Sequence, residues 1–247
     1  MKAVVTPVGR RVRATGALYV LPALAVLVVT SLLPTLLGAY YSLTDYSGLG
    51  DKHFVGFDNY VQMFHDPAVG KAAWVTVVFT IITVPVQTVL SMLLAEILAK
   101  TMRNWFGSVA RSVLFIPVIA SMVLVGTVWR ILLSNEGFVN GLLRAFGIAS
   151  VNWLGSPMWA LPTVAMIAIW KDIGYFLVIY YAAILDVPKD LYESAALDGA
   201  GPFKRFWHIT MPQTRHATVL IVIVGTMWSF QTFDIMRFSH QGGLVDV

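Results

Sequence analysis

The sequence predicts an all-α protein, a polytopic integral membrane helical bundle, and three observations support this fold class. Hydrophobic residues make up 57% of the 247 residues and charged residues make up 12%, which is about half the usual charged fraction of a globular protein. Long segments carry no charge, and loops rich in lysine and arginine alternate with loops poor in them. A soluble domain of this length would need a polar surface, and this composition does not supply one.

Five segments bracketed by charged residues are long enough to cross a membrane, because a hydrocarbon core about 30 Å thick needs roughly 20 apolar helical residues. Helix is the expected conformation, since lipid offers no hydrogen-bond partners to the backbone. The fourth segment is interrupted by Lys171 and Asp172. The expected spans are approximately residues 16–43, 71–98, 109–133, 158–185 and 215–238.

Several prolines lie inside these spans or near their ends. In a bundle, neighbouring helices can provide partners for the carbonyl groups that a proline leaves free. The sequence leaves two interpretations open, kinked helices around a cavity or bends near helix ends. The prolines are Pro22, Pro34, Pro85, Pro117 and Pro162.

The N-terminal tail, residues 1–15, carries Lys2, Arg10, Arg11 and Arg13 and no acidic residue. The apolar segment after it is longer than the 7–15 residues of a signal-peptide core, so we expect an uncleaved membrane anchor. The loops after the second and fourth spans are also basic. Because basic loops stay on the cytoplasmic side, we expect a multi-pass protein with a cytoplasmic N-terminus.

Two loops on the predicted outer side have aromatic residues at roughly helical spacing. Residues 54–64 read "FVGFDNYVQMF" and residues 137–148 read "GFVNGLLRAFGI". Both patterns predict amphipathic helices at the membrane interface, where aromatic side chains are favoured. The odd number of spans leads us to expect a sixth span beyond the last residue given.

The loop between the fourth and fifth spans, residues 186–214, is polar and predicts two short helices. Residues 191–200 form the first helix, with Asp190 as its N-cap. Gly199 ends that helix, and Pro202 suits the first turn of the next one. An ordinary structured connection between two spans remains an alternative at this point.

The second short helix of this loop has the sequence "FKRFWHI". Phe203, Phe206 and Trp207 fall on one face of it, and Pro212 is expected to close the unit before the fifth span. In the first helix, Ser194 and the two alanines that follow give a surface of small side chains that another backbone can approach closely.

The spacing of residues in this loop resembles a family pattern. Membrane subunits of ATP-binding-cassette importers carry Glu-Ala-Ala, three residues, Gly, nine residues, Ile, one residue and Leu-Pro. This sequence departs from the pattern mildly, at Ser194 and Met211. The positions that match the spacing are Glu193, Ser194, Ala195, Gly199, Ile209, Met211 and Pro212.

The resemblance extends over nearly the whole chain. The segments "FVGFDNYVQMF", "VPKDLYESAALDGAGPFKRFWHITMP" and "FDIMRFSHQGG" are similar to carbohydrate permeases of the maltose and glycerol-3-phosphate type, and to the first of their two permease subunits. The resemblance implies a type I importer transmembrane domain over residues 16–247. It also implies a location in the bacterial cell membrane and a sixth span at the C-terminal end.

This family resemblance implies partners and roles for the loop residues. A short helix in the loop would dock on a cytoplasmic ATPase, present in two copies, and a second permease subunit would complete a heterodimer. An extracytoplasmic solute-binding protein would deliver the substrate. We expect no cofactor in this chain, because it has no Walker A pattern, and ATP and Mg would bind the ATPase. The implied coupling residues are Glu193, Ser194, Ala195, Asp198, Gly199, Phe203 and Pro212.

Polar residues inside the fourth span are candidates for a substrate path, because such residues are costly in a membrane. Asp172 and Tyr175 are three residues apart, and Trp170 is expected to share their side of the helix. An aromatic ring can stack on a sugar and a carboxylate can accept from its hydroxyl groups. Alternatively, Lys171 and Asp172 simply pair with each other or with neighbouring helices.

The fifth span adds further candidates for the substrate path, where the family places substrate contacts. Hydrogen bonds to adjacent helices are the alternative role for the two hydroxyl-bearing residues, Ser229 and Thr232. Val118 and Met122 in the third span replace more polar or aromatic residues of maltose-type relatives, so the identity of the sugar stays open. The candidates in the fifth span are Trp228, Ser229, Gln231 and Thr232.

Two other function classes fit the sequence less well than the importer does. An ion-coupled secondary transporter would use Lys171 and Asp172 as a proton relay, but it has no use for the loop pattern. A membrane enzyme would need catalytic groups on the spans, and all five histidines lie in loops or at span ends. The chain has no cysteine, no metal site is expected, and no basic tract interleaved with aromatics suggests nucleic-acid binding.

Overall fold

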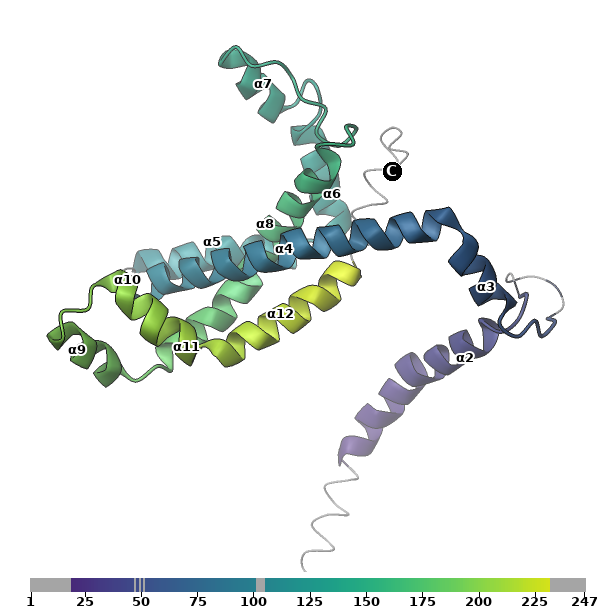
Figure 1. The fold of residues 1–247 in the computed structure, drawn as a ribbon, viewed down its shortest axis with the longest axis horizontal. Coiled ribbons are helices and arrows are strands. Elements are labelled where there is room, and N and C mark those ends of the chain that lie inside the picture. Colours follow the sequence, from purple (N-terminus) through teal and green to yellow (C-terminus); the bar gives the residue numbers. More distant parts are fainter. Residues whose placement is uncertain (1–18, 47, 49, 51, 101–104, 232–247) are drawn as a thin grey trace, which may run out of the picture. The chain divides into compact units, whose positions relative to one another are not determined.

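The computed structural model describes residues 19–231 except residues 47, 49, 51 and 101–104. The described residues are helices joined by turns and loops, with one isolated bridge as the only extended pairing among them (Figure 1). The chain divides into two compact units, Met1–Gly70 and Lys71–Val247. The basic tail and Thr232 lie outside the described residues, so the predictions made for them stay predictions.

The first unit begins with an apolar helical segment, Tyr19–Tyr41, and none of its apolar window is buried within the described chain. The segment contains a π-helical turn, η1 (Val28–Leu32), followed by α2 (Leu33–Tyr41). Pro34 has no N–H to give to the carbonyl of Thr30, and its ring would clash with that carbonyl. The wider π turn just before Pro34 relieves this conflict, so the proline widens the helix without ending it.

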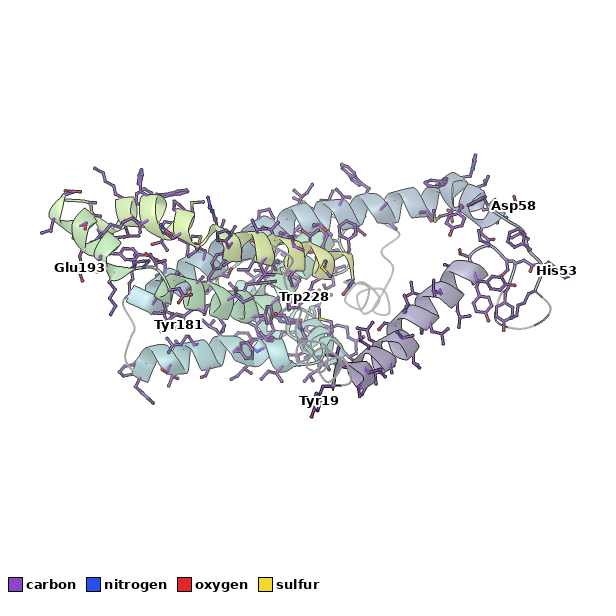
Figure 2. All side chains as sticks on the ribbon, turned by 90° about the horizontal axis from the view of Figure 1, so that it is seen from below. Tyr19, His53, Asp58, Tyr181, Glu193 and Trp228 are labelled. Carbon is purple, nitrogen blue, oxygen red and sulfur yellow. The ribbon has the colours of Figure 1, made fainter. Side chains whose placement is uncertain are left out.

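The connection from α2 to α3 (Asp58–His65) is held by local hydrogen bonds. The Asn59 side-chain amide donates to the carbonyls of Ser42 (2.9 Å) and Thr44 (2.8 Å). The Tyr60 hydroxyl lies 2.7 Å from the Ser42 hydroxyl. These bonds tie the first turn of α3 to the end of α2, and Figure 2 shows Asp58 at the start of that helix. The helix predicted within residues 54–64 is therefore confirmed.

Five helices of the second unit are apolar, and Figure 1 shows α4, α5, α8 and α12 running alongside one another. By length and composition, the described residues contain three helices able to cross a membrane, or four if α5 and α6 count as one span. Helix α12 is shorter in the described residues. The agreement with five expected spans is therefore approximate. The five helices are α4 (Pro67–Lys100), α5 (Trp105–Ile119), α6 (Met122–Leu132), α8 (Ala160–Leu185) and α12 (Arg215–Phe230).

The third expected span, residues 109–133, is broken in the structure. Helices α5 and α6 meet at an angle of 101°. Ser121 is the N-cap of α6, and its hydroxyl accepts a hydrogen bond from the backbone N–H of Leu124 at 3.3 Å. Pro117 lies in the last turn of α5. The prediction of one continuous helix is wrong here, because a proline followed by a capping serine ends one helix and starts another.

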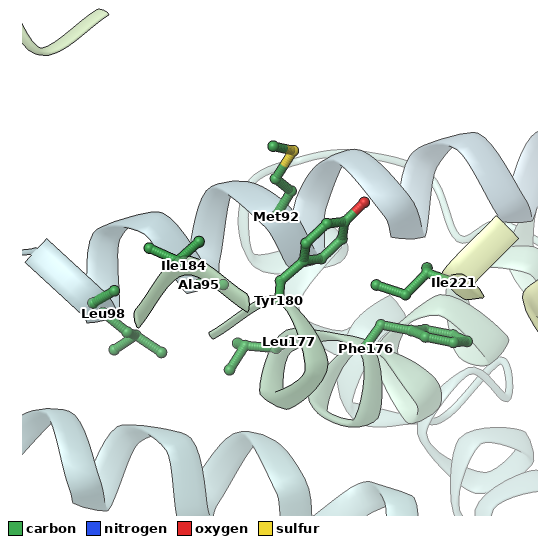
Figure 3. Close-up of a cluster of buried hydrophobic side chains, with 9 residues drawn as sticks. Met92, Ala95, Leu98, Phe176, Leu177, Tyr180, Ile184 and Ile221 are labelled. Atoms are coloured by element: carbon green, nitrogen blue, oxygen red, sulfur yellow. The ribbon is translucent and has the colours of Figure 1, made fainter. Parts of the chain in front are cut away.

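The core of the second unit lies where α4, α8 and α12 meet (Figure 3). The Tyr180 hydroxyl of α8 donates to the Thr218 hydroxyl of α12 at 3.0 Å. Lipid is as apolar as these side chains, so close packing is what holds such helices together. The fully or nearly fully buried core residues are Met92, Ala95, Leu98, Ala99, Phe176, Leu177, Tyr180, Ile184 and Ile221.

A glycine allows the close approach of α5 and α8. A Cβ added at Gly174 would lie 2.1 Å from the carbonyl oxygen of Leu114. Such a distance excludes any side chain unless the two backbones separate. The sequence "DIGYF" therefore contains a packing requirement in addition to its polar residues.

The loop after α6 is organised around one buried amide, that of Asn140, in α7 (Phe138–Ala145). The amide nitrogen donates to the carbonyls of Ser134 and Val151, both at 3.0 Å. The amide oxygen accepts from the Val151 N–H (2.9 Å) and the Trp153 indole (3.2 Å). The amphipathic helix predicted within residues 137–148 is confirmed.

Candidate coupling segment and polar pocket

Helix α9 (Lys189–Leu197) begins the segment between α8 and α12, and none of its residues is buried. Pro188 is its N-cap residue, and no side chain makes a capping hydrogen bond there. The prediction of Asp190 as N-cap is therefore wrong, because the helix already starts directly after the proline. Asp190 lies in the first turn, where a negative charge is favourable beside the helix N-terminus.

The end of α9 is a tight turn that requires glycine. Gly199 has φ +75°, a left-handed conformation that glycine adopts without steric cost. The Gly199 N–H donates to the Ala196 carbonyl (3.1 Å), and the Ala200 N–H donates to the Ala195 carbonyl (2.8 Å). This pair of hydrogen bonds is the Schellman arrangement of helix C-termini. The predicted break at Gly199 is confirmed.

The second part of the segment is longer than predicted. Pro212 lies inside it and does not close it, because the helical turns continue past it to a break at Thr214. As at Pro34, a π turn precedes the proline: the Met211 N–H donates to the Phe206 carbonyl. The elements are α10 (Pro202–Arg205), with Pro202 in its first turn as predicted, η2 (Phe206–Thr210) and α11 (Met211–Gln213).

We call residues 189–213 the coupling segment. All its predicted contact residues are exposed except Ala195, which is partly buried. Glu193 is exposed on α9 (Figure 2). Leu197 is 90% exposed four residues after Glu193, and the sequence interpretation missed it. The sequence did contain a signal for this contact residue, namely a leucine one helical turn after an acidic residue in an otherwise polar helix.

The three aromatic residues of the second helix do not share one environment, although the pattern placed them on one face. Phe206 packs against the core, whereas Phe203 is 74% exposed and Trp207 is also exposed. The Trp207 ring contacts both of the others, with centroid distances of 6.1 Å to Phe203 and 5.9 Å to Phe206. Phe206 fixes the segment to the bundle, and Phe203 is available to a partner.

A small polar pocket lies between α4, α8 and α12. The cavity itself has a volume of about 10 Å³, room for about one water molecule and far below the 300–1,000 Å³ of typical ligand sites. Three of the predicted substrate-path residues, Asp172, Trp228 and Ser229, line it together. The full lining consists of Phe79, Thr83, Gln87, Ala168, Asp172, Gly225, Trp228 and Ser229.

Helix α4 contributes pocket residues that the sequence interpretation missed. The Thr83 hydroxyl lies 3.2 Å from the Ser229 hydroxyl of α12. Gln87 is 4% exposed, and a Cβ added at Gly225 would lie 2.4 Å from its side-chain nitrogen. Thr83 and Gln87 are one turn apart inside an apolar span, and polar residues in such a place are candidates for function.

Asp172 has two roles in the structure, because it lines the pocket and also pairs with its neighbour. The Lys171 ammonium donates to the Asp172 carboxylate at 3.2 Å, and each side chain is 15% exposed. The predicted pairing is therefore confirmed alongside the pocket position. No cluster of three or more potential metal-ligating side chains occurs in the part of the chain that the structure describes.

Three further predicted substrate-path residues, Trp170, Tyr175 and Gln231, lie outside the pocket lining. Tyr175 stacks obliquely on Trp228, with ring centroids 5.0 Å apart. Trp170 packs on Trp129 of α6 at 5.5 Å. The expectation that Trp170 shares the side of Asp172 is wrong, because residues two apart on a helix are separated by about 200°. Gln231 is exposed at the end of α12.

An apolar helical bundle with a polar pocket and an exposed helical segment at one end is the architecture of a membrane transport subunit. Residues 61–244 match the family model described as "Binding-protein-dependent transport system inner membrane component". The chain belongs to this family. It is a membrane permease subunit of an ATP-binding-cassette importer and not an enzyme. This assignment excludes the alternative function, an ion-coupled secondary transporter.

Named relatives agree with this assignment. The chain is 33% identical over 231 residues to the probable ABC transporter permease protein YurN of Bacillus subtilis, covering 92% of this chain and 78% of YurN. It is 30% identical to the trehalose/maltose transport system permease protein MalF of Thermococcus litoralis, covering 92% and 77%. A bacterial ABC transporter involved in alginate import has the same fold, with a TM-score of 0.78 and 22% identity over 92% of this chain and 78% of that chain.

Proposed function

We propose that this chain is one of two permease subunits of an ATP-driven importer for a sugar or a related polar solute, working by alternating access. The coupling segment is the observation that carries the proposal. Its first helix, α9, is mostly exposed, and the segment is acidic at Glu193 and Asp198 and shaped by the left-handed turn at Gly199. Its residue spacing is the one that the resemblance assigns to the ATPase contact.

The substrate class rests on relatives and on pocket chemistry. Relatives are named as permeases for trehalose and maltose, for lactose and for glycerol-3-phosphate. The pocket offers the Asp172 carboxylate, the Gln87 amide and an aromatic ring, Trp228. Carboxylates and amides can pair with sugar hydroxyl groups, and an aromatic face can stack on a sugar ring. Because the pocket is small, this chain supplies one wall of the path and a second permease subunit supplies the other.

The proposed assembly contains two copies of a cytoplasmic ATPase, and these bind the ATP and Mg. A solute-binding protein delivers substrate from outside the bacterial cell membrane. Glu193 and Phe203 are exposed and would contact a groove on one ATPase. This arrangement places the N-terminus and the coupling segment in the cytoplasm, in agreement with the basic loops.

Copurification and reconstitution test this proposal. The tagged chain, expressed with its genomic neighbours, should copurify with a second permease and two ATPase copies. In liposomes, uptake of radiolabelled maltose, trehalose or lactose should require ATP inside and the binding protein outside. Substrate uptake by this chain alone would contradict the importer assignment.

Cysteine labelling tests the orientation, because the chain has no native cysteine. Leu197→Cys lies on the exposed coupling segment, and Glu136→Cys lies on the outer loop with a side chain that is 91% exposed. A reagent that cannot cross membranes should label Glu136→Cys in intact cells and Leu197→Cys only after lysis. The reverse result would invert the proposed topology.

A further inference from the structure

A buried polar cluster joins the end of α4 to the coupling segment, and its residues are not part of the pocket lining. Thr210 of η2 is fully buried, and its hydroxyl lies within hydrogen-bond distance of groups on two other helices. On α4, the ion pair between Glu96 and Lys100 spans one helical turn. We call Glu96, Lys100, Thr210 and Tyr192 of α9 the polar clamp. The distances from the Thr210 hydroxyl are 3.3 Å to Glu96 Oε1, 3.3 Å to Lys100 Nζ and 2.9 Å to the Tyr192 hydroxyl.

The chemistry of the Thr210 hydroxyl decides which partner donates. An ammonium group only donates and a carboxylate only accepts, whereas a hydroxyl has one hydrogen and two lone pairs. Thr210 therefore donates to Glu96 and accepts from Lys100. Its remaining lone pair accepts the hydrogen of the Tyr192 hydroxyl. Each hydrogen-bonding position of this hydroxyl is in use, so the cluster specifies one arrangement of α4, α9 and η2.

Tyr192 contacts the clamp through its ring as well as its hydroxyl. The Lys100 ammonium lies 4.1 Å from the centroid of the Tyr192 ring, a cation–π distance. Burial raises the pKa of Tyr192 above its ordinary value, although the hydrogen bond with Thr210 acts in the opposite direction. The phenol therefore stays neutral and remains a donor throughout the physiological range.

Little else in α9 is packed against the bundle. Tyr192 and Ala195 are its only partly buried residues, and the rest of the helix is exposed. The next residue, Glu193, is exposed, and the proposed function assigns it to the ATPase contact. Apart from the chain connections to α8 and α10, α9 therefore contacts the bundle chiefly through the Tyr192 side chain.

We propose that the polar clamp makes α9 move together with α4, so that motion of the coupling segment is carried into a helix that lines the polar pocket. Gln87 of α4 lines that pocket, about 13 Å along the helix from Glu96. The inference rests on the proposed function of the coupling segment and assigns positioning roles to residues outside both the pocket and the exposed contact surface.

Three substitutions isolate the Thr210 hydroxyl. Thr210→Val removes it at nearly constant shape, and Thr210→Ser keeps it. Thr214→Val is the matched control, because Thr214 is buried one turn further on and its hydroxyl donates to the Thr210 carbonyl at 2.9 Å, within its own segment. Tyr192→Phe is a second test, since it keeps the ring over Lys100 and removes one donated hydrogen bond.

The decisive measurement is a distance distribution between spin labels at Leu93→Cys on α4 and Leu191→Cys on α9, both exposed positions. It is recorded on the assembled complex in lipid, with and without ATP and vanadate. The parent, Thr214→Val and Thr210→Ser should each give one narrow distribution with the same centre in both states. Thr210→Val should broaden it, and Tyr192→Phe should broaden it less. Distributions in Thr210→Val and Tyr192→Phe as narrow as in the control would overturn the inference.

Two further readouts on the same samples separate this inference from the proposed function. Thr210→Val should retain the ATPase but lower its stimulation by the binding protein roughly threefold to tenfold, and Thr210→Ser should restore it. Unchanged stimulation in Thr210→Val would count against the clamp. Failure of the parent complex to retain an ATPase would contradict the proposed function. The spin-label distance distribution within this chain would still show whether the polar clamp holds α9 to α4.

Discussion

The coupling segment and the polar pocket are built in different ways. The coupling segment is one continuous stretch, residues 189–213, whose shape follows from local signals such as Gly199 and Pro202. The pocket is assembled from three helices, and its Thr83 and Ser229 hydroxyls meet across 146 positions of sequence. A contact surface can thus be encoded locally, whereas a binding site inside a bundle depends on long-range packing. Damage to one region should therefore leave the other largely intact.

The largest expected effect concerns the ion pair at the pocket. Asp172→Ala leaves the Lys171 ammonium, whose side chain is 15% exposed, without its carboxylate. Breaking a buried pair from one side costs about 3–5 kcal/mol. We expect a lower yield of complex and a lower midpoint of thermal unfolding, measured by size-exclusion chromatography after heating.

A double variant separates folding from function at this position. Lys171→Met combined with Asp172→Leu removes both charges and should restore thermal stability. Stimulation of ATP hydrolysis by sugar and binding protein should remain impaired, because the pocket has lost its carboxylate. Recovery of both thermal stability and stimulation of ATP hydrolysis would show that the Lys171–Asp172 ion pair has a structural role only.

The next effect tests the dependence of the pocket region on helix packing. Gly174→Ala places a methyl group where the Leu114 carbonyl lies 2.1 Å away, and overpacking of this kind costs about 1–3 kcal/mol. The unfolding midpoint should fall. Gly141→Ala on α7 is the matched control, because a Cβ there meets nothing within 4 Å. Equal midpoints for the two variants would show that α5 and α8 can separate freely.

A second glycine substitution, in the coupling segment, is also expected to cause steric strain, but its effect should stay within that segment. Gly199→Val forces a β-branched residue into a left-handed conformation, at a cost of roughly 1–2 kcal/mol. Copurification of the ATPase should fall while the unfolding midpoint of the bundle stays the same. Gly201→Ala is the control, because Gly201 has φ −68° and no atom within 4 Å of an added Cβ. Equal ATPase retention in both variants would argue that the turn is only a connector.

The sequence predicted what depends on neighbouring residues and failed where distant residues decide. The break at Gly199 and the start of α10 at Pro202 follow from backbone preferences that act within one turn. Gln87 was missed because only the packing of α4 against α12 gives it a pocket to line. Trp170 is an exception, because residues two apart on a helix are separated by about 200°, so local geometry alone already excluded a side shared with Asp172.

The prolines show a third kind of limit on sequence interpretation. Pro34 and Pro212 both follow a π turn and sit inside continuing helices. A proline signals that a hydrogen bond is lost, but it does not say whether the helix ends or widens. Pro117, followed by the capping Ser121, does accompany a break. The capping hydroxyl is the local feature that distinguishes this case.

The smallest expected effect lies within the pocket. Thr83→Val removes the hydroxyl that lies 3.2 Å from Ser229, and one neutral hydrogen bond contributes about 0.5–1.5 kcal/mol. The apparent KM for sugar-dependent ATP hydrolysis should rise by up to roughly tenfold, with ATPase retention unchanged. Thr76→Val is the control, because its hydroxyl bonds only within α4 (to the Ala72 carbonyl). If the KM of Thr83→Val shifts no more than that of the control, Thr83 has no role in the substrate path.

The central claim is that ATPase attachment belongs to the coupling segment and substrate dependence to the pocket region. Glu193→Lys and Tyr175→Ala test it most directly when ATPase copurification and sugar-stimulated hydrolysis are measured on both. Glu193→Lys reverses an exposed charge and should lower copurification. Tyr175→Ala removes the ring that packs on Trp228 and should change sugar stimulation with the ATPase still attached. Wild-type copurification in Glu193→Lys, or loss of the ATPase in Tyr175→Ala, would contradict this division.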